Sequence, residues 1–325
     1  MKIFFSILVA LLLSVVGICQ AEKQTSGYPS KAIRWIVTYP PGGGTDIVAR
    51  MIAPLLSQRL GQPVVVDNRG GASGMIGTEL CARAPNDGHT LLLGTSSGLL
   101  ILPLLSRKMP FDTFKDFVAI SLIVVIPQML VVNPSLALHS VKDLIATAKA
   151  QPGQLRYATA GLGSPNHLAT ELLSYMTHVQ MTHVPYKGAA AGIIDVISGQ
   201  IQWMFNPMPA LMPQVRAGKL RALAVSGAQR SLAVPDLPTV AESGVPGYEY
   251  VLWYGMFGPA KIDRSIVSRL NQELSQILSQ AEMGQALMAQ GAEVKPTTPD
   301  QFLSFMRADA KRIATVIRLA NIQLD

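Results

Sequence analysis

The sequence predicts an α/β fold made of two doubly wound units, each a parallel sheet with helices on both faces. Three observations favour this class. Strand patterns alternate with amphipathic helix patterns from residue 32 to about residue 95, and again from about residue 128, which is typical of parallel sheets covered by helices. In each unit a strand runs into a glycine-rich loop that opens a helix. The 325 residues also suffice for about two domains of ordinary size.

The first 21 residues have the pattern of a secretory signal. Lys2 precedes an apolar run over 3–18, which is too short to span a bilayer as a stable helix. Cys19 and Ala21 form the small-x-small pattern of a signal peptidase site, so we expect cleavage after Ala21 and export to the periplasm. A lipid anchor on Cys19 is the alternative, and the branched Ile18 before it argues against that modification.

The first unit is expected to alternate strands and helices in the order 32–39 (strand), 45–60 (helix), 63–68 (strand), 73–84 (helix) and 89–95 (strand). The first helix ends at Gly61, and the turn signal "APNDG" precedes the third strand. Ligands of such sheets bind beyond the carboxyl ends of the strands. Thr95 and Ser96 lie at such an end.

The second unit is expected in the order 128–134 (strand), 140–153 (helix), 155–160 (strand) and a helix that starts at Pro165. Ser164 is a suitable N-cap for that helix, and proline is favoured at the first helical position. The loop "GLGS" before it corresponds to the loop "PPGGGTD" of the first unit. Each loop would present free backbone N–H groups and the positive end of a helix dipole. Two facing helix starts of this kind form a clamp for a small anion.

The known phosphate and nucleotide fingerprints are missing from these loops. A Walker loop requires lysine before serine or threonine, whereas Gly44 is followed by Thr45 and Asp46. The dinucleotide pattern G-x-G-x-x-G is also not matched, so we expect no cofactor. The net charge of +7 comes without a basic run interleaved with aromatic residues, which argues against nucleic acid as a partner.

A series of motifs along the chain resembles one known family. The motifs are "PPGGGTD", "VVVDNRGGASGMIG", "APNDGHTLLLG", "HVPYKGAAAGIIDVISGQIQ", "AGKLRALAVSGAQRS", "LPTVAESGVPGYE" and "WYGMFGPA". In order and spacing they are similar to the Bug, or TctC-like, periplasmic solute-binding proteins of tripartite tricarboxylate transporters. The similarity runs from about Tyr28 to Asp325.

The resemblance implies a type II periplasmic binding protein fold, in which two doubly wound lobes are joined by crossing strands and a ligand cleft lies between them. The first crossing would fall in 120–128 and the return near 247–257. Lobe 1 would then comprise 22–126 and 249–325, and lobe 2 would comprise 127–248, with 1–21 as the signal peptide.

In this family a small carboxylate is held mainly by the backbone of two loops. The matching positions are Gly43, Gly44, Thr45 and Asp46 in the first lobe and Gly161, Leu162, Gly163 and Ser164 in the second. Further candidates at the ends of the expected strands and helices are Tyr39, Thr95, Ser96, His167, Tyr186, Gly188, Phe205 and Asn206. His167 could instead cap its own helix, and Tyr39 and Trp253 are candidates either for stacking on a ligand or for core packing. The roles of Asn206 and Lys187 stay open.

The implied function is capture of a small carboxylate in the periplasm and its delivery to the membrane subunits of the transporter. We expect a monomer without cofactor, metal or enzymatic activity. A hydrolase using Ser164 and His167 is disfavoured, because "GLGSPN" is not a G-x-S-x-G elbow. A sensor module that presents the same closed state to a signalling receptor is the second alternative. The sequence leaves the identity of the carboxylate open.

Overall fold

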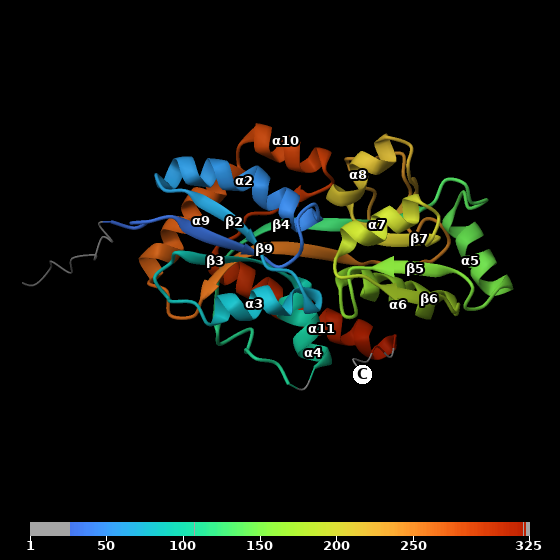
Figure 1. Ribbon diagram of the computed structural model, residues 1–325, viewed down its shortest axis with the longest axis horizontal. Coiled ribbons are helices and arrows are strands. Elements are labelled where there is room, and N and C mark those ends of the chain that lie inside the picture. Colours follow the sequence, from blue (N-terminus) through green and yellow to red (C-terminus); the bar gives the residue numbers. More distant parts are fainter. Residues whose placement is uncertain (1–26, 107, 321, 323–325) are drawn as a thin grey trace, which may run out of the picture.

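The computed structural model describes residues 27–106, 108–320 and 322, so the predicted signal lies outside the described residues. The molecule is elongated, with two groups of helices around strands side by side (Figure 1). Two long strands, β4 (Phe117–Val132) and β9 (Val251–Pro259), run between the two groups. Within the described ranges, no helix has both the length and the apolarity needed to cross a bilayer.

The described strands form one ten-stranded sheet in the order β2-β1-β3-β9-β4-β7-β5-β6, and β8 and β10 also pair with β4. β1 pairs in parallel with β2 and β3, while β5 pairs in parallel with β6 and β7. The other bounds are β1 (Ile33–Val37), β2 (Val64–Asn68), β3 (Thr90–Thr95), β5 (Arg156–Thr159), β6 (Thr182–Pro185), β7 (Trp203–Pro207), β8 (Arg221–Val225) and β10 (Glu293–Val294). The two predicted parallel units are therefore both present.

Strand β4 belongs to both halves of the sheet. Its residues 117–127 pair with β9, and its residues 128–132 pair with β7. The sequence predicts a crossing in 120–128 followed by a separate strand, whereas the structure has one continuous strand of 16 residues. Pro127, which has no N–H to donate, lies where the partner strand changes. The unbroken strand connects the two halves of the sheet.

Helices cover the sheet in each half. The half that contains β1 carries α2 (Gly44–Leu60), η1 (Ala72–Gly74), α3 (Met75–Ala82), η2 (Ser97–Ile101), α4 (Leu102–Leu105), α9 (Arg264–Leu278) and α10 (Ala281–Ala289). The other half carries α5 (Val141–Ala150), α6 (Pro165–Thr177), α7 (Ala189–Ile197) and α8 (Met208–Arg216). In α2 the buried Val48, Ile52 and Leu56 recur every fourth residue, and Gly61 ends the helix in the left-handed conformation.

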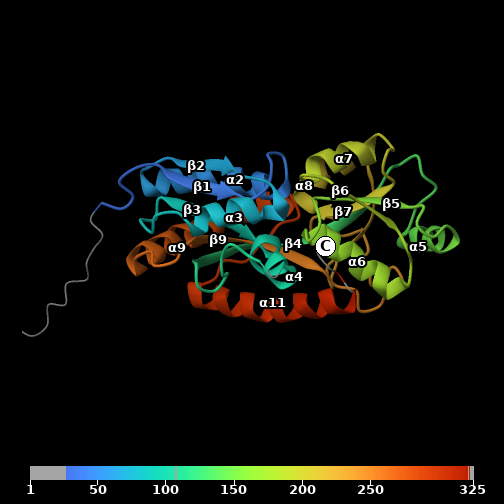
Figure 2. The ribbon, with the colours of Figure 1, turned by 60° about the horizontal axis from the view of Figure 1, so that its bottom comes forward.

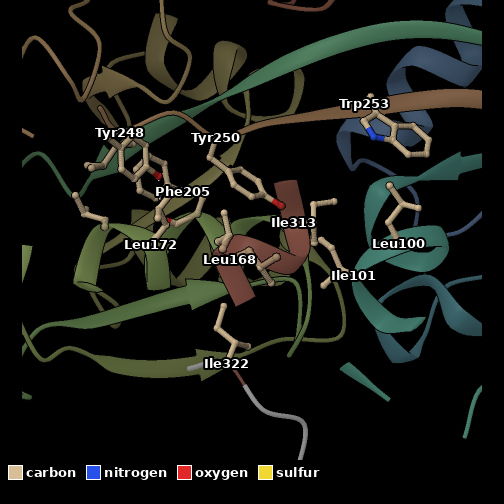
Figure 3. Close-up of a cluster of buried hydrophobic side chains, with 14 of the residues drawn as sticks. Leu100, Ile101, Leu168, Leu172, Phe205, Tyr248, Tyr250, Trp253, Ile313 and Ile322 are labelled. Carbon is tan, nitrogen blue, oxygen red and sulfur yellow. Dashed lines mark hydrogen bonds between the residues drawn. The ribbon is translucent and has the colours of Figure 1, made fainter. Parts of the chain in front are cut away.

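The C-terminal helix α11 (Pro299–Leu319) runs along both halves (Figure 2). It begins with a capping box between Thr298 and Gln301. Its buried residues join a core that extends from η2 to α6, and Figure 3 shows Ile313 between Ile101 and Leu168.

Trp253 belongs to this core. Its Nε1 donates a hydrogen bond of 2.7 Å to Asp309 of α11, and its ring packs edge-on against Phe302. Of the two roles that the sequence left open for Trp253, the structure shows core packing.

Candidate ligand-binding site

A cavity of about 240 Å³ lies between the two halves of the sheet. Its walls are the loops after β1, β5, β6 and β7, the end of β3 and the middle of β9. The lining residues are Tyr39, Pro40, Gly43, Gly44, Thr45, Thr95, Ala160, Pro165, Asn166, Lys187, Gly188, Ala189, Ala190, Ala191, Asn206, Pro207, Leu252 and Tyr254. Because drug-sized ligands occupy pockets of about 300–1,000 Å³, this cavity suits a small solute.

Four helices begin at the cavity wall. They are α2, α6, α7 and α8, which start at Gly44, Pro165, Ala189 and Met208. The N–H groups of a first helical turn have no partner within the helix, and the dipole makes this end positive. Prolines take away donors at the starts of α6 and α8, so α2 and α7 supply most of the free N–H groups. The arrangement favours a bound anion.

Two glycines allow the walls of the cavity to approach each other. A Cβ atom on Gly44 would lie 2.9 Å from the Tyr254 hydroxyl oxygen and 3.2 Å from Pro207 Cβ. A Cβ atom on Gly188 would lie 3.0 Å from Pro40 Cδ, and its φ of +140° is one that side chains rarely adopt. Both positions therefore require glycine for the observed approach of the two halves.

The cavity wall carries no carboxylate within the described residues. Its one charged side chain is the exposed Lys187. Asp46 is buried, but its Oδ2 accepts from the Gly42 N–H at 3.0 Å and its Oδ1 from Arg50 Nε at 2.9 Å. Burial alone would raise the pKa of Asp46, and the hydrogen bonds from Arg50 and Gly42 outweigh it, so the pKa lies below its ordinary value. The Asp46 carboxylate therefore stabilises the first loop and is not part of the cavity lining. The described residues also contain no group of His, Cys, Asp or Glu placed to hold a metal ion.

The second predicted loop joins the two halves of the molecule. Ser73 Oγ donates to the Leu162 carbonyl oxygen. Ser97 Oγ lies 2.8 Å from the Ser73 carbonyl oxygen and 3.0 Å from the Gly163 carbonyl oxygen, so its one proton is shared between them. Ser73 has a positive φ of 52°, an uncommon conformation for a residue with a side chain. These contacts lie beside the cavity and describe a closed arrangement of the two halves.

A neighbouring cavity of about 580 Å³ lies on the other side of Tyr39 and Ala160. Gly161, Leu162 and Tyr186 line this second cavity, and Tyr39 lines both. The sequence-predicted residues that line the first cavity are therefore Tyr39, Gly43, Gly44, Thr45, Thr95, Gly188 and Asn206.

The side chains of Ser164 and His167 make local contacts behind the second loop. Ser164 occupies the expected N-cap position of α6, but its hydroxyl accepts no hydrogen bond from a helix N–H, and its one proton is shared between the Gly161 carbonyl oxygen and Asn166 Oδ1. His167 Nδ1 accepts from the Gly163 N–H at 3.4 Å, and its ring stacks on His183 with 4.4 Å between centroids. The pKa of His167 is lowered to about 3, mainly by burial and to a smaller extent by the charge of His183. The ring is therefore neutral near pH 7.

Two further predicted residues lie behind the wall. Phe205 stacks on Tyr248 with 6.0 Å between centroids, within the core of the second half. Ser96 is 1% exposed and follows β3 directly. Neither side chain belongs to the lining of the two cavities.

The sequence analysis missed several lining residues. Leu252 and Tyr254 reach the cavity from β9, about 200 residues after the first loop. Tyr254 belongs to the motif "WYGMFGPA", but nothing in that motif indicates a cavity residue, because only the sheet order brings β9 beside β3. Asn166 follows the predicted second loop directly, and its place in the first turn of α6 could have indicated it.

Comparisons with known proteins agree on one family. A profile described as "Tripartite tricarboxylate transporter family receptor" matches residues 48–322. The protein BugT of Bordetella pertussis is 39% identical over 96% of this chain and 98% of its own. An R. palustris protein solved with adipate shares 37% identity at a TM-score of 0.89, covering 91% of this chain and 99% of that chain. MatC from Rhodopseudomonas palustris with bound malate shares 28% identity at a TM-score of 0.84, covering 89% and 100%.

Proposed function

The chain belongs to the tripartite tricarboxylate transporter receptor family, and from this premise we propose that it captures a small carboxylate and delivers it to the membrane subunits of such a transporter. The observation that carries the proposal is the meeting of four helix N-termini at a cavity whose described lining holds no carboxylate. Relatives solved with adipate and malate support the class of ligand. The expected two-lobed periplasmic binding protein fold is confirmed, and this family and fold are those of solute-binding proteins, not of enzymes.

The geometry explains how a carboxylate would be bound without any catalytic step. A carboxylate between the lobes accepts hydrogen bonds from the free N–H groups of α2 in one lobe and α7 in the other. Because the ligand contacts both lobes only when they are closed, it stabilises the closed state by its difference in affinity for the two states. The contacts from Ser73 to Leu162 and from Ser97 to Gly163 then add protein hydrogen bonds to the closed state.

Several assignments are part of this proposal. Lobe 1 comprises 22–126 and 249–325 and lobe 2 comprises 127–248, which the change of partner strand along β4 at residue 128 supports. Residues 1–21 direct export to the periplasm, where the mature chain acts as a monomer. The ligand-binding set comprises the seven sequence-predicted residues that line the first cavity, extended by Asn166 and Tyr254.

The experiment is a thermal unfolding series on the mature protein, first unfolded and refolded to remove bound solute. Small carboxylates are added one at a time, each with the corresponding amide as its control. A ligand present at about 100 times its Kd adds about 2.7 kcal/mol of stability. Stabilisation by an acid and not by its amide supports the proposal. An unchanged unfolding temperature across the whole series contradicts it.

A further inference from the structure

The side-chain amide of Asn206 has an unused donor at the cavity wall. Asn206 lies in β7, lines the cavity and is 1% exposed. Its Nδ2 has no hydrogen-bond partner among the described residues. Because nearly all buried polar atoms in folded proteins are hydrogen-bonded, such an atom in a cavity wall calls for a partner from a ligand.

Neighbouring hydrogen bonds fix which end of the amide is free. Asn166 Oδ1 accepts from the Ala160 backbone N–H, which can only donate, at 3.3 Å and from the Ser164 hydroxyl at 2.6 Å. These bonds leave Asn166 Nδ2 to donate to Asn206 Oδ1 at 3.4 Å. Asn206 Nδ2 is therefore the atom that remains free, since the reverse orientation would bring two NH₂ groups together.

The surroundings of Asn206 are rich in donors and poor in anionic acceptors. The N-termini of α2 and α7 and the side chain of Lys187 contribute donors and positive charge. Two carboxylates on the helices that begin at the cavity have other partners, because Asp46 of α2 bonds to Arg50 and Asp195 of α7 accepts from Tyr186. A ligand ammonium group, which only donates, finds neither a counter-ion nor a suitable partner at Asn206.

We infer that Asn206 determines ligand specificity by requiring an acceptor oxygen at this wall, so that the solute is a dicarboxylate without an amino group. The inference rests on the proposed function and narrows it. One carboxylate binds at the helix starts, and the second group offers its oxygen to Asn206 Nδ2. An amino acid of the same length loses affinity because its ammonium group is desolvated without a negative partner.

The first test compares acids with their amino derivatives. Refolded wild-type protein is titrated calorimetrically with succinate and L-aspartate, and with adipate and L-2-aminoadipate. We expect at least one dicarboxylate to bind at least roughly tenfold more tightly than its amino derivative, which corresponds to about 1.4 kcal/mol.

Two substitutions test the side chain itself. Asn206→Asp replaces the donor by a carboxylate, so it should weaken dicarboxylate binding at least roughly tenfold and reduce or reverse the preference over the amino derivative. Asn206→Leu keeps the branching at Cγ and removes both donor and acceptor. It should weaken dicarboxylate binding without improving the amino derivative. Circular dichroism and the unfolding temperature of the ligand-free variants establish that each is folded.

The outcomes separate this inference from the proposed function. If dicarboxylates bind but the amino derivatives bind as tightly, or if both folded variants retain wild-type affinities, the inference is wrong and the proposed function stands. If no carboxylate in the wider series binds, the proposed function fails and the inference fails with it. If Asn206→Asp does not fold, the wild-type pairs and Asn206→Leu decide the question.

Discussion

Replacing Gly44 by alanine adds one methyl group where the first loop meets the opposite wall of the cavity. The new Cβ atom would lie 2.9 Å from the Tyr254 hydroxyl oxygen and 3.2 Å from Pro207 Cβ. Tyr254 is only 2% exposed, so its side chain has little room to move away. Pro207 belongs to the proposed lobe 2, whereas Gly44 belongs to lobe 1. The contact with Pro207 therefore acts against the closed state and not against the open one.

The expected size of the effect follows from this contact. Overpacking by a methyl group in a well-packed site typically costs about 1–3 kcal/mol. If that cost falls on the closed state, the affinity for the carboxylate decreases by about 5- to 150-fold, since each 1.4 kcal/mol is roughly tenfold. Gly44 does not have a positive φ, so the helix start accepts alanine and the ligand-free protein should stay folded. Gly44→Val, with two more methyl groups, should lose still more affinity.

The assay is isothermal titration with the carboxylate that stabilises the wild type most in the thermal series. Gly284→Ala is the matched control, because a Cβ atom at this position in α10 meets nothing within 4 Å. The control should bind like the wild type. Equal affinities for wild type, Gly44→Ala and Gly284→Ala would refute the assignment of the first loop to the closed ligand site.

Three other predictions concern the second loop. Ser97→Ala removes a hydroxyl whose one proton is shared between the Ser73 carbonyl oxygen and, across the cleft, the Gly163 carbonyl oxygen. Ligand affinity measured by calorimetry should therefore fall by about 0.5–1.5 kcal/mol, and unchanged affinity would contradict a role in closure. Ser164→Ala loses the bond to the Gly161 carbonyl oxygen and should weaken binding by about 1 kcal/mol in calorimetry, whereas complete loss would indicate direct side-chain chemistry. The pKa of His167 is lowered from 6.5 to about 3 in the folded state, so the unfolded chain binds the proton first and the free energy of unfolding should fall as the pH drops below about 6.5. The urea midpoint should therefore fall less between pH 7 and pH 4 for His167→Gln than for the wild type. Equal falls in the two proteins would show that other groups are responsible.

The local part of the site was predictable from the sequence. The loops around Gly44 and Gly188 follow strands and open helices, and such loops lie at the carboxyl edge of a parallel sheet. The direction of Asp46 was not predictable, because the partners Arg50 and Gly42 compete for its carboxylate through geometry that the sequence alone does not specify. A polar residue can therefore lie in the predicted loop without its side chain facing the ligand.

The faces of the strands β7 and β9 show the same limit. Successive side chains of a strand point to opposite faces. Asn206 faces the cavity, whereas Phe205 before it packs on Tyr248 in the core. Likewise Tyr254 lines the cavity, whereas Trp253 bonds to α11. Alternation predicts that only one residue of each pair lines the cleft, but the choice between them depends on which face α6 and α11 cover, and that is set by distant segments.

Backbone N–H groups and side-chain donors at the cavity have different roles in the proposed ligand recognition. Backbone N–H groups at the starts of α2 and α7 are present whatever side chains the helices carry, so in the proposed function they would hold a carboxylate without selecting among carboxylates. Selection must then come from the few side chains that reach the cavity with a polar atom, among them Asn206 and Thr95, whose Nδ2 and Oγ1 are both buried and unpaired among the described residues. We therefore expect a substitution of Asn206 to change which second group is accepted and to leave binding at the helix starts intact. Specificity in this protein should therefore be easier to alter than its preference for an acid.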